Sequence, residues 1–141
     1  MYGDTEVIRG LARGLRDRGG EIRAEADRLR RRAEATPWSG LAADAMRLRV
    51  GEQVASLHHT AGLHDDAAEA LELHATAVER IKALIAAVEA RARALVAAAQ
   101  DRLLGLAAAV LPDPVDELVA RFVPPPPGHR DWLTVELPGL S

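Results

Sequence analysis

The stretch ATPWSGLAADAMR, residues 35–47, lies between two long runs rich in alanine, leucine, arginine and glutamate. Pro37 lacks the backbone donor that a helix interior needs, and it disfavours the α conformation at Thr36, so a first helix ends there. Ser39 is the favoured N-cap of a second helix, and Gly40 is the alternative. The stretch therefore predicts the turn between two antiparallel helices, and this turn decides the fold.

The helix before the turn, expected at about residues 5–36, carries two columns of residues at a spacing of seven. The large column is Ile8, Leu15, Ile22 and Leu29, and the small column is Ala12, Gly19, Ala26 and Ala33. One large and one small column predict a coiled-coil-like packing seam in which another backbone approaches closely. The pair Gly19-Gly20 fits that close approach, and a kink at the pair is the rival interpretation.

The helix after the turn is expected at about residues 41–111, because its apolar three-four spacing passes Gly62 without a slip. Counting back from the turn at equal rise places Ile8 opposite roughly residue 68, so the first helix is used up near Leu71. An apolar stripe then continues without a partner, and a helix needs such a face buried. The predicted partner interface is Val78, Ile81, Ile85, Val88, Leu95, Leu103 and Leu106. A partner chain, a second copy and the chain's own tail are the three candidates to cover it.

The predicted fold is all-α, with an antiparallel helical hairpin over residues 1–111 and a second part over 112–141. The second part begins with a short amphipathic helix in DPVDELVARF. The proline run VPPPPGH follows as an extended spacer, and RDWLTVELPGLS ends the chain as a weak strand or coil.

Composition excludes several classes of function. A chain of 141 residues forms one domain with a modest core, and its net charge of -3 with 3% aromatic residues argues against a nucleic-acid partner. There is no cysteine, which excludes disulfides and thiolate metal sites. The most apolar run, LLGLAAAVL at residues 103–111, is shorter than the roughly 20 residues of a membrane span. The start MYGDTEVIRG has no apolar core of a Sec-type signal peptide.

Polar clusters along the helices are interpreted as solvated faces. His58, Asp65, Glu69 and Glu72 share one helical face, which favours a solvated face over a divalent-metal site. His64 falls on the seam, where we expect a hydrogen-bonded interface residue. The arginines of RLRRRAEA, residues 28–35, favour helix-surface ion pairs over anion binding, and the predicted pairs are Glu25 with Arg28 and Asp27 with Arg31. No nucleophile has an evident base partner and no glycine-rich phosphate loop is present, so we expect neither an enzyme nor a cofactor.

Trp38 is one of only two tryptophans, and its place in the turn calls for a reason. An indole at the open end of a hairpin covers apolar surface from both helices while its N–H reaches a hydrogen-bond partner. Gly40 then lets the backbone pass beneath the ring or adopt a positive φ. The sequence thus predicts a buried packing role for Trp38.

Trp38, Ser39 and Gly40 between two long amphipathic helices resemble the WXG (Trp-Xaa-Gly) superfamily of helical-hairpin proteins linked to type VII, or ESX, secretion. The resemblance covers about residues 5–75. It implies a homodimer, or a heterodimer with another WXG-like helical protein. It also implies a protein that is cytoplasmic before export, secreted or in the cell envelope afterwards, and has the export ATPase or a toxin cargo as further partners.

The chain departs from that family in its export signal. Members often carry Tyr-x-x-x-Asp/Glu after the second helix, and the nearest counterpart here is Trp132 followed by Glu136. We take these two as a candidate export signal on a proline-tethered tail, with a signal supplied by a partner as the other option. The alternative function is a non-exported cytoplasmic adaptor or chaperone that dimerises through the same stripe. A tail that only packs back onto the helices favours this alternative.

Overall fold

The computed structural model describes residues 4–106 and 111–140, and their regular structure is entirely helical. Helix α1 spans Thr5–Ala35 and helix α2 spans Leu41–Leu104. A short helix α3 spans Pro114–Ala120, and a 3-10 turn, η1, spans Arg130–Thr134. The prediction of an all-α chain with a long second helix and a short third one is confirmed.

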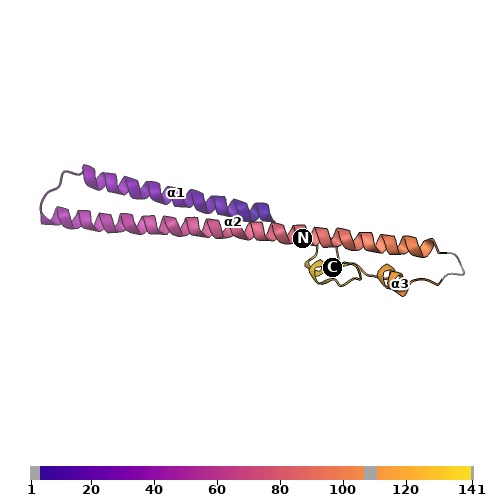
Figure 1. The fold of residues 1–141 in the computed structure, drawn as a ribbon. Helices are drawn as coiled ribbons and strands as arrows, with labels where there is room; N and C mark the ends of the chain where they lie inside the picture. The colour runs from indigo at the N-terminus through magenta and orange to yellow at the C-terminus, as the bar shows by residue number, and fades with distance from the viewer. Residues whose placement is uncertain (1–3, 107–110, 141) are drawn as a thin grey trace. The chain divides into compact units, whose positions relative to one another are not determined.

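Helix α2 is 64 residues long and contributes to two compact units, Thr5–Thr76 and the part that begins at Ala77. The boundary between the two units thus lies inside α2. The first unit contains α1 and the beginning of α2, which lie side by side (Figure 1). The second contains the rest of α2 with α3 and η1.

The first unit is held together by small residues. The small column of α1 faces α2 and is buried at Ala12, Gly19 and Ala26, as predicted. The buried residues of α2 in this unit are equally small: Ala43, Val54, Ala61, Ala68 and Ala75. A Cβ built on Gly19 would lie 3.3 Å from the carbonyl oxygen of Ala61, so glycine permits the close approach here. Helix α1 continues from Thr5 to Ala35 without a break at the glycine pair. Close approach accounts for Gly19, whereas a Cβ on Gly20 would meet no atom within 4 Å.

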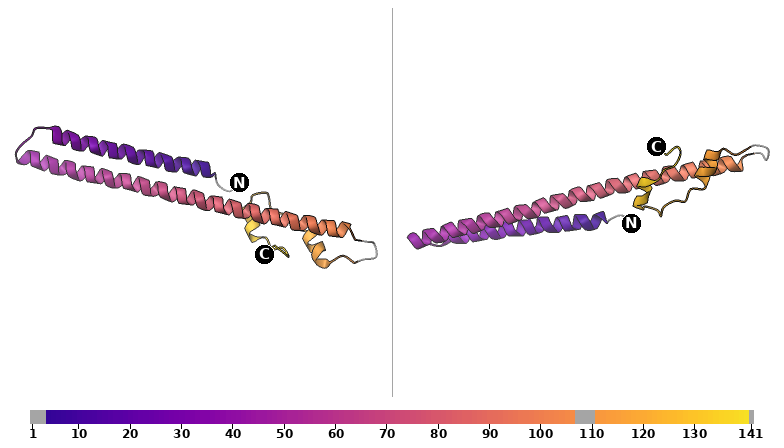
Figure 2. Two further views of the ribbon diagram at one scale, coloured as in Figure 1. Left: turned by 45° about the horizontal axis from the view of Figure 1, so that its top comes forward. Right: turned by 90° about the horizontal axis from the view of Figure 1, so that it is seen from below.

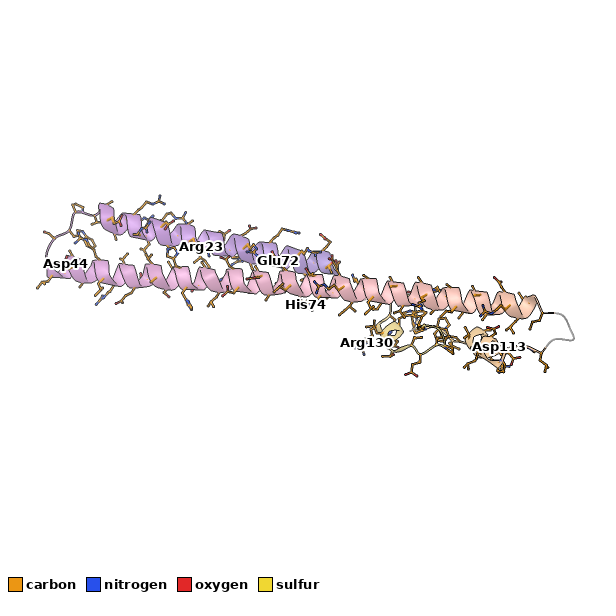
Figure 3. The ribbon with its side chains drawn as sticks, viewed as in Figure 1. Arg23, Asp44, Glu72, His74, Asp113 and Arg130 are labelled. Atoms are coloured by element: carbon orange, nitrogen blue, oxygen red, sulfur yellow. The ribbon has the colours of Figure 1, made fainter. Side chains whose placement is uncertain are left out.

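Two ion pairs connect the helices beside this small-residue contact. Arg16 of α1 donates to both carboxylate oxygens of Glu72, at 3.1 and 2.9 Å, and Arg23 pairs with Asp65. Figure 3 shows these side chains, with Arg23 and Glu72 labelled. Counting equal numbers of residues from the turn places Gly19 opposite about residue 57. In the structure Gly19 lies against Ala61 and Asp65 instead, so α2 is shifted relative to the predicted alignment. The reason is visible in Figures 1 and 2, where α2 begins beyond the end of α1.

In the second unit, the chain after α2 packs back onto α2. Asp113 caps α3 by accepting a hydrogen bond from the Val115 N–H at 2.9 Å, with Pro114 in the first turn. Arg102 of α2 holds α3 through Asp116, with the shortest contact at 2.7 Å. The core of this unit is Ile85, Ala92 and Trp132. Around it pack Ile81, Val88, Phe122, Val135, Leu137 and Leu140.

The end of α2 differs from the prediction. The helix stops at Leu104, not near Leu111, and the Gly105 N–H donates to the Asp101 carbonyl at 3.0 Å. Glycine has low helix propensity and readily ends a helix, whereas the spacing pattern counted it as part of the run. Leu106 therefore lies outside the helix, and residues 107–110 of the predicted helix lie outside the described residues.

Candidate functional site

The turn after α1 places Trp38 on the surface. Pro37 follows the helix end, the Trp38 N–H donates to the Thr36 carbonyl at 2.9 Å, and Gly40 adopts a φ of 101°. The positive φ is one of the two predicted roles of Gly40; an added Cβ there would meet no atom within 4 Å, so the backbone does not pass beneath the ring. Gly40 also occupies the N-cap position, and its carbonyl accepts from the Asp44 N–H at 3.0 Å. Ser39 lies outside the helix.

The predicted burial of Trp38 is wrong. Its side chain is 50% exposed, and its indole N–H has no hydrogen-bond partner among residues 4–106 and 111–140. Trp38 lines a groove of about 170 Å3 together with Leu29, Arg32, Ala33, Thr36, Met46, Arg47 and Val50. Trp38 lies outside both helices, between the end of α1 at Ala35 and the start of α2 at Leu41, and the groove that it lines covers only part of the side chain. Because a large aromatic side chain is accessible here and not buried, the turn is a candidate recognition site.

Arginines surround the turn. Arg47 donates to the Trp38 carbonyl oxygen and pairs with Asp44 at 3.4 Å, which ties the turn to the first part of α2. Arg28 pairs with Glu25, as predicted, whereas Asp27 pairs with Arg30 at 3.6 Å and not with Arg31. Within the described part of the chain, the side chains of Arg31, Arg32 and Arg49 enter no ion pair.

The second tryptophan has the reverse environment. Trp132 is 0% exposed, and its indole N–H donates to the Pro126 carbonyl oxygen at 2.9 Å. The Phe122 ring lies 6.2 Å away between centroids, and the Arg93 guanidinium lies 6.0 Å from the centroid of the Trp132 ring. The expectation that Trp132 stands on a flexible tail is therefore wrong, because the proline run returns the chain to α2. Glu136 is exposed, so the two residues of the candidate export signal do not form one accessible element.

Polar contacts reinforce this packing, and we call them, together with Trp132, the tail clasp. Glu89 accepts from the Gly128 N–H at 3.1 Å and from Arg93 at 2.8 Å. The hydrogen bond from Arg93 and that from Gly128 both lower the pKa of Glu89. Arg91 donates to the Gly139 carbonyl oxygen at 3.0 Å. Sequence patterns did not single out Glu89, Arg91 or Arg93; the apolar residues of the tail around Trp132 are the signal that could have found the clasp.

The predicted partner interface is partly covered by the chain itself. Ile85 is 1% exposed, and Ile81 and Val88 pack on the same cluster as Trp132. Val78 is buried, and Leu95 and Leu103 are half-buried. Leu106, beyond the helix end, is exposed. Of the three candidates for covering this stripe, the structure shows the chain's own tail, so the stripe from Ile81 to Val88 needs no second chain.

The contacts of the polar face weighed for metal binding and of His64 show the roles of these residues in the first unit. Asp65 and Glu72, two members of the polar face weighed for metal binding, are the partners of Arg23 and Arg16. Across the described residues no group of three metal-ligating side chains comes together. His64 is half-buried, and its Nδ1 lies 2.9 Å from the Thr60 carbonyl oxygen, so it is hydrogen-bonded as expected.

None of the helices in the described ranges has the length and apolar content that crossing a membrane requires. Comparison with protein families, with curated proteins and with solved structures finds no match to this chain.

Proposed function

We propose that this protein is a helical-hairpin module of the WXG kind, associated with type VII secretion, that works by binding and not by catalysis. In this proposal α1 and the beginning of α2 form the hairpin with a coiled-coil-like seam, and the Trp38-Ser39-Gly40 turn is offered to a partner. The observation that carries the proposal is the half-exposed Trp38, whose indole N–H is free among the described residues. A half-exposed tryptophan that lines a groove and has a free donor is suited to an interface.

The partners that fit this proposal are a second WXG-like helical protein, as a homodimer or heterodimer, the ESX export ATPase, and a toxin cargo. Because the tail clasp covers the stripe around Ile85, the exposed turn is the better candidate for partner contact. The protein would then be cytoplasmic before export and secreted or in the cell envelope afterwards.

Export in culture tests the proposal. The wild type and the variant Trp38→Ala are expressed in a type VII-competent actinobacterial host, together with a candidate partner encoded by a neighbouring gene. Culture filtrates are then compared with cell lysates. We expect the wild type in the filtrate and Trp38→Ala retained in the cells, with equal helicity of the purified proteins. Wild-type protein found only in lysates, with the secretion system intact, would refute the secretion proposal.

The alternative is a non-exported cytoplasmic adaptor, and one observation favours it. Trp132 is buried in the tail clasp, which removes the aromatic half of the candidate export signal from the surface. The exposed half can be tested without disturbing the core, by Glu136→Ala with the exposed Glu52→Ala as control. Reduced export of Glu136→Ala alone would support a signal in this chain. Equal export of both would point to a signal supplied by a partner, and absence of any export would leave the adaptor.

A further inference from the structure

The end of the first unit that carries the turn is both cationic and apolar at its surface. Residues 28–49 contain six arginines and two acids, although the formal net charge of the whole chain is -3. The turn and the start of α2 expose large apolar side chains, among them Leu41, which is 90% exposed. The exposed set is Trp38, Leu41, Met46 and Leu48.

We propose that this end of the hairpin, which we call the tip, docks peripherally on an anionic lipid surface. The tip consists of Trp38, Leu41, Met46 and Leu48 with the surrounding arginines at positions 28, 30, 31, 32, 47 and 49. The inference concerns the purified chain and does not depend on the proposed role in secretion.

The charges of the tip favour an anionic partner. Arg28, Arg30 and Arg47 each have an acidic neighbour, but Arg31, Arg32 and Arg49 enter no ion pair within the described residues. Arg32 lies in the last turn of α1, which ends at Ala35, and Arg31 directly precedes it. At a rise of 1.5 Å per residue they lie about 5 Å along the axis from the helix end. Trp38 and Arg32 line the same groove, so an anionic surface touched by Trp38 also comes within reach of the Arg32 guanidinium.

The apolar side chains favour a bilayer over a nucleic acid or an acidic protein. Aliphatic side chains such as Leu41 and Leu48 gain nothing from a phosphate backbone, and one tryptophan makes no stacking platform for bases. Tryptophan favours the boundary between lipid headgroups and acyl chains, where its ring is buried and its N–H stays hydrated. Trp38, half exposed and with a free N–H, meets both requirements. Long arginine side chains around an apolar centre match anionic headgroups around the inserted residues.

Vesicle binding with matched variants tests the proposal. The full chain is sedimented with vesicles of phosphatidylglycerol and phosphatidylcholine, and with vesicles of phosphatidylcholine alone. Arg31→Gln/Arg32→Gln removes two cations at the tip. Arg13→Gln/Arg18→Gln removes two from the same helix, at least about 25 Å from its end at the rise of an α-helix. We expect the tip variant to lower the partition coefficient on anionic vesicles by about tenfold or more, and the control to change it less than twofold.

Fluorescence separates docking from simple charge attraction. Lipids with brominated acyl chains quench a tryptophan that reaches the acyl boundary, so they should quench Trp38 and leave the buried Trp132 unaffected. The quenching should disappear in Trp38→Phe. Equal loss of binding in both arginine variants, or binding without quenching, would overturn the proposal. Absence of binding to anionic vesicles, with duplex DNA or an acidic protein bound through Arg31 and Arg32 instead, would also overturn it.

Discussion

At the scale of single residues, the two tryptophans are distinguished by what lies next to them. Trp38 is in a turn at the end of two helices and lines a shallow groove. Trp132 lies between Phe122, Arg93 and the apolar face of α2, and its N–H is satisfied by Pro126. The same side chain is therefore half exposed in one place and buried in the other.

We expect Trp132→Ala to destabilise the tail clasp by about 3–5 kcal/mol, as for other buried tryptophans. Trp38→Ala should cost clearly less, because half of that side chain is already exposed. Urea denaturation followed by circular dichroism, with trypsin cleavage at Arg130 as a local probe, measures both. A larger loss of stability for Trp38→Ala than for Trp132→Ala would contradict this assignment.

The adjacent glycines of α1 provide a matched pair. Gly20→Ala should stabilise the protein by about 0.5–1 kcal/mol, because alanine has the higher helix propensity and no atom lies within 4 Å of the new Cβ. Gly19→Ala should lower the melting temperature, since its Cβ would lie 2.9 Å from Asp65 Oδ1 and 3.3 Å from the Ala61 carbonyl oxygen. Thermal unfolding of both variants is the measurement. A gain in stability for Gly19→Ala equal to that of Gly20→Ala would show that the close contact is absent.

At the scale of elements, arginine–carboxylate pairs connect α1 to α2. The hydrogen bond from Arg23 is the main cause that lowers the pKa of Asp65, and the hydrogen bond from Arg16 does the same for Glu72. A carboxylate with a lowered pKa in the folded state stabilises that state above its unfolded pKa, and the effect is lost as the pH falls through the folded pKa. These pairs are partly exposed, so their contribution is modest.

We therefore expect the melting temperature of the first unit to fall as the pH is lowered from 7 through about 4, the ordinary range of Asp and Glu. The double variant Asp65→Asn/Glu72→Gln should melt lower at pH 7 and show a flatter acid dependence. Asp66→Asn, a neighbouring exposed carboxylate with no ion pair in the described residues, is the control. Circular dichroism melts between pH 7 and pH 3 make the comparison, and identical acid slopes for all three proteins would refute the role of the pairs.

At the scale of the whole molecule, the segment after α2 decides whether the stripe of α2 is available to other chains. Its anchors are Trp132, packed with Ile85 and Ala92, and Asp116, paired with Arg102. A helix face of this kind is not stable when left in water, and covering it in the same chain removes the need for a partner there.

Deleting residues 112–141 should therefore cause self-association through the stripe that contains Ile81, Ile85 and Val88. Analytical ultracentrifugation at low micromolar concentration should detect dimers or larger species of the shortened chain. The full chain at the same concentration should show less association. Ile85→Glu in the shortened chain should restore the monomer, because a buried charge is costly in an apolar contact. A shortened chain that stays monomeric and fully helical would contradict the expectation.

The sequence by itself determined the helical class, the position of the turn and the small-residue face of α1. Pro37 and the spacing of seven along Ala12, Gly19 and Ala26 are local signals, fixed by backbone sterics and helical period. Only the tertiary structure decided which tryptophan is buried and what covers Ile85. These depend on how much of Trp38 the groove beside it covers, and on the return of the chain through the proline run to α2. Sequence patterns detect hydrophobic residues that recur at a regular spacing. The short tail is anchored mainly by one buried indole, which has no such spacing, so the sequence pattern does not predict its packing.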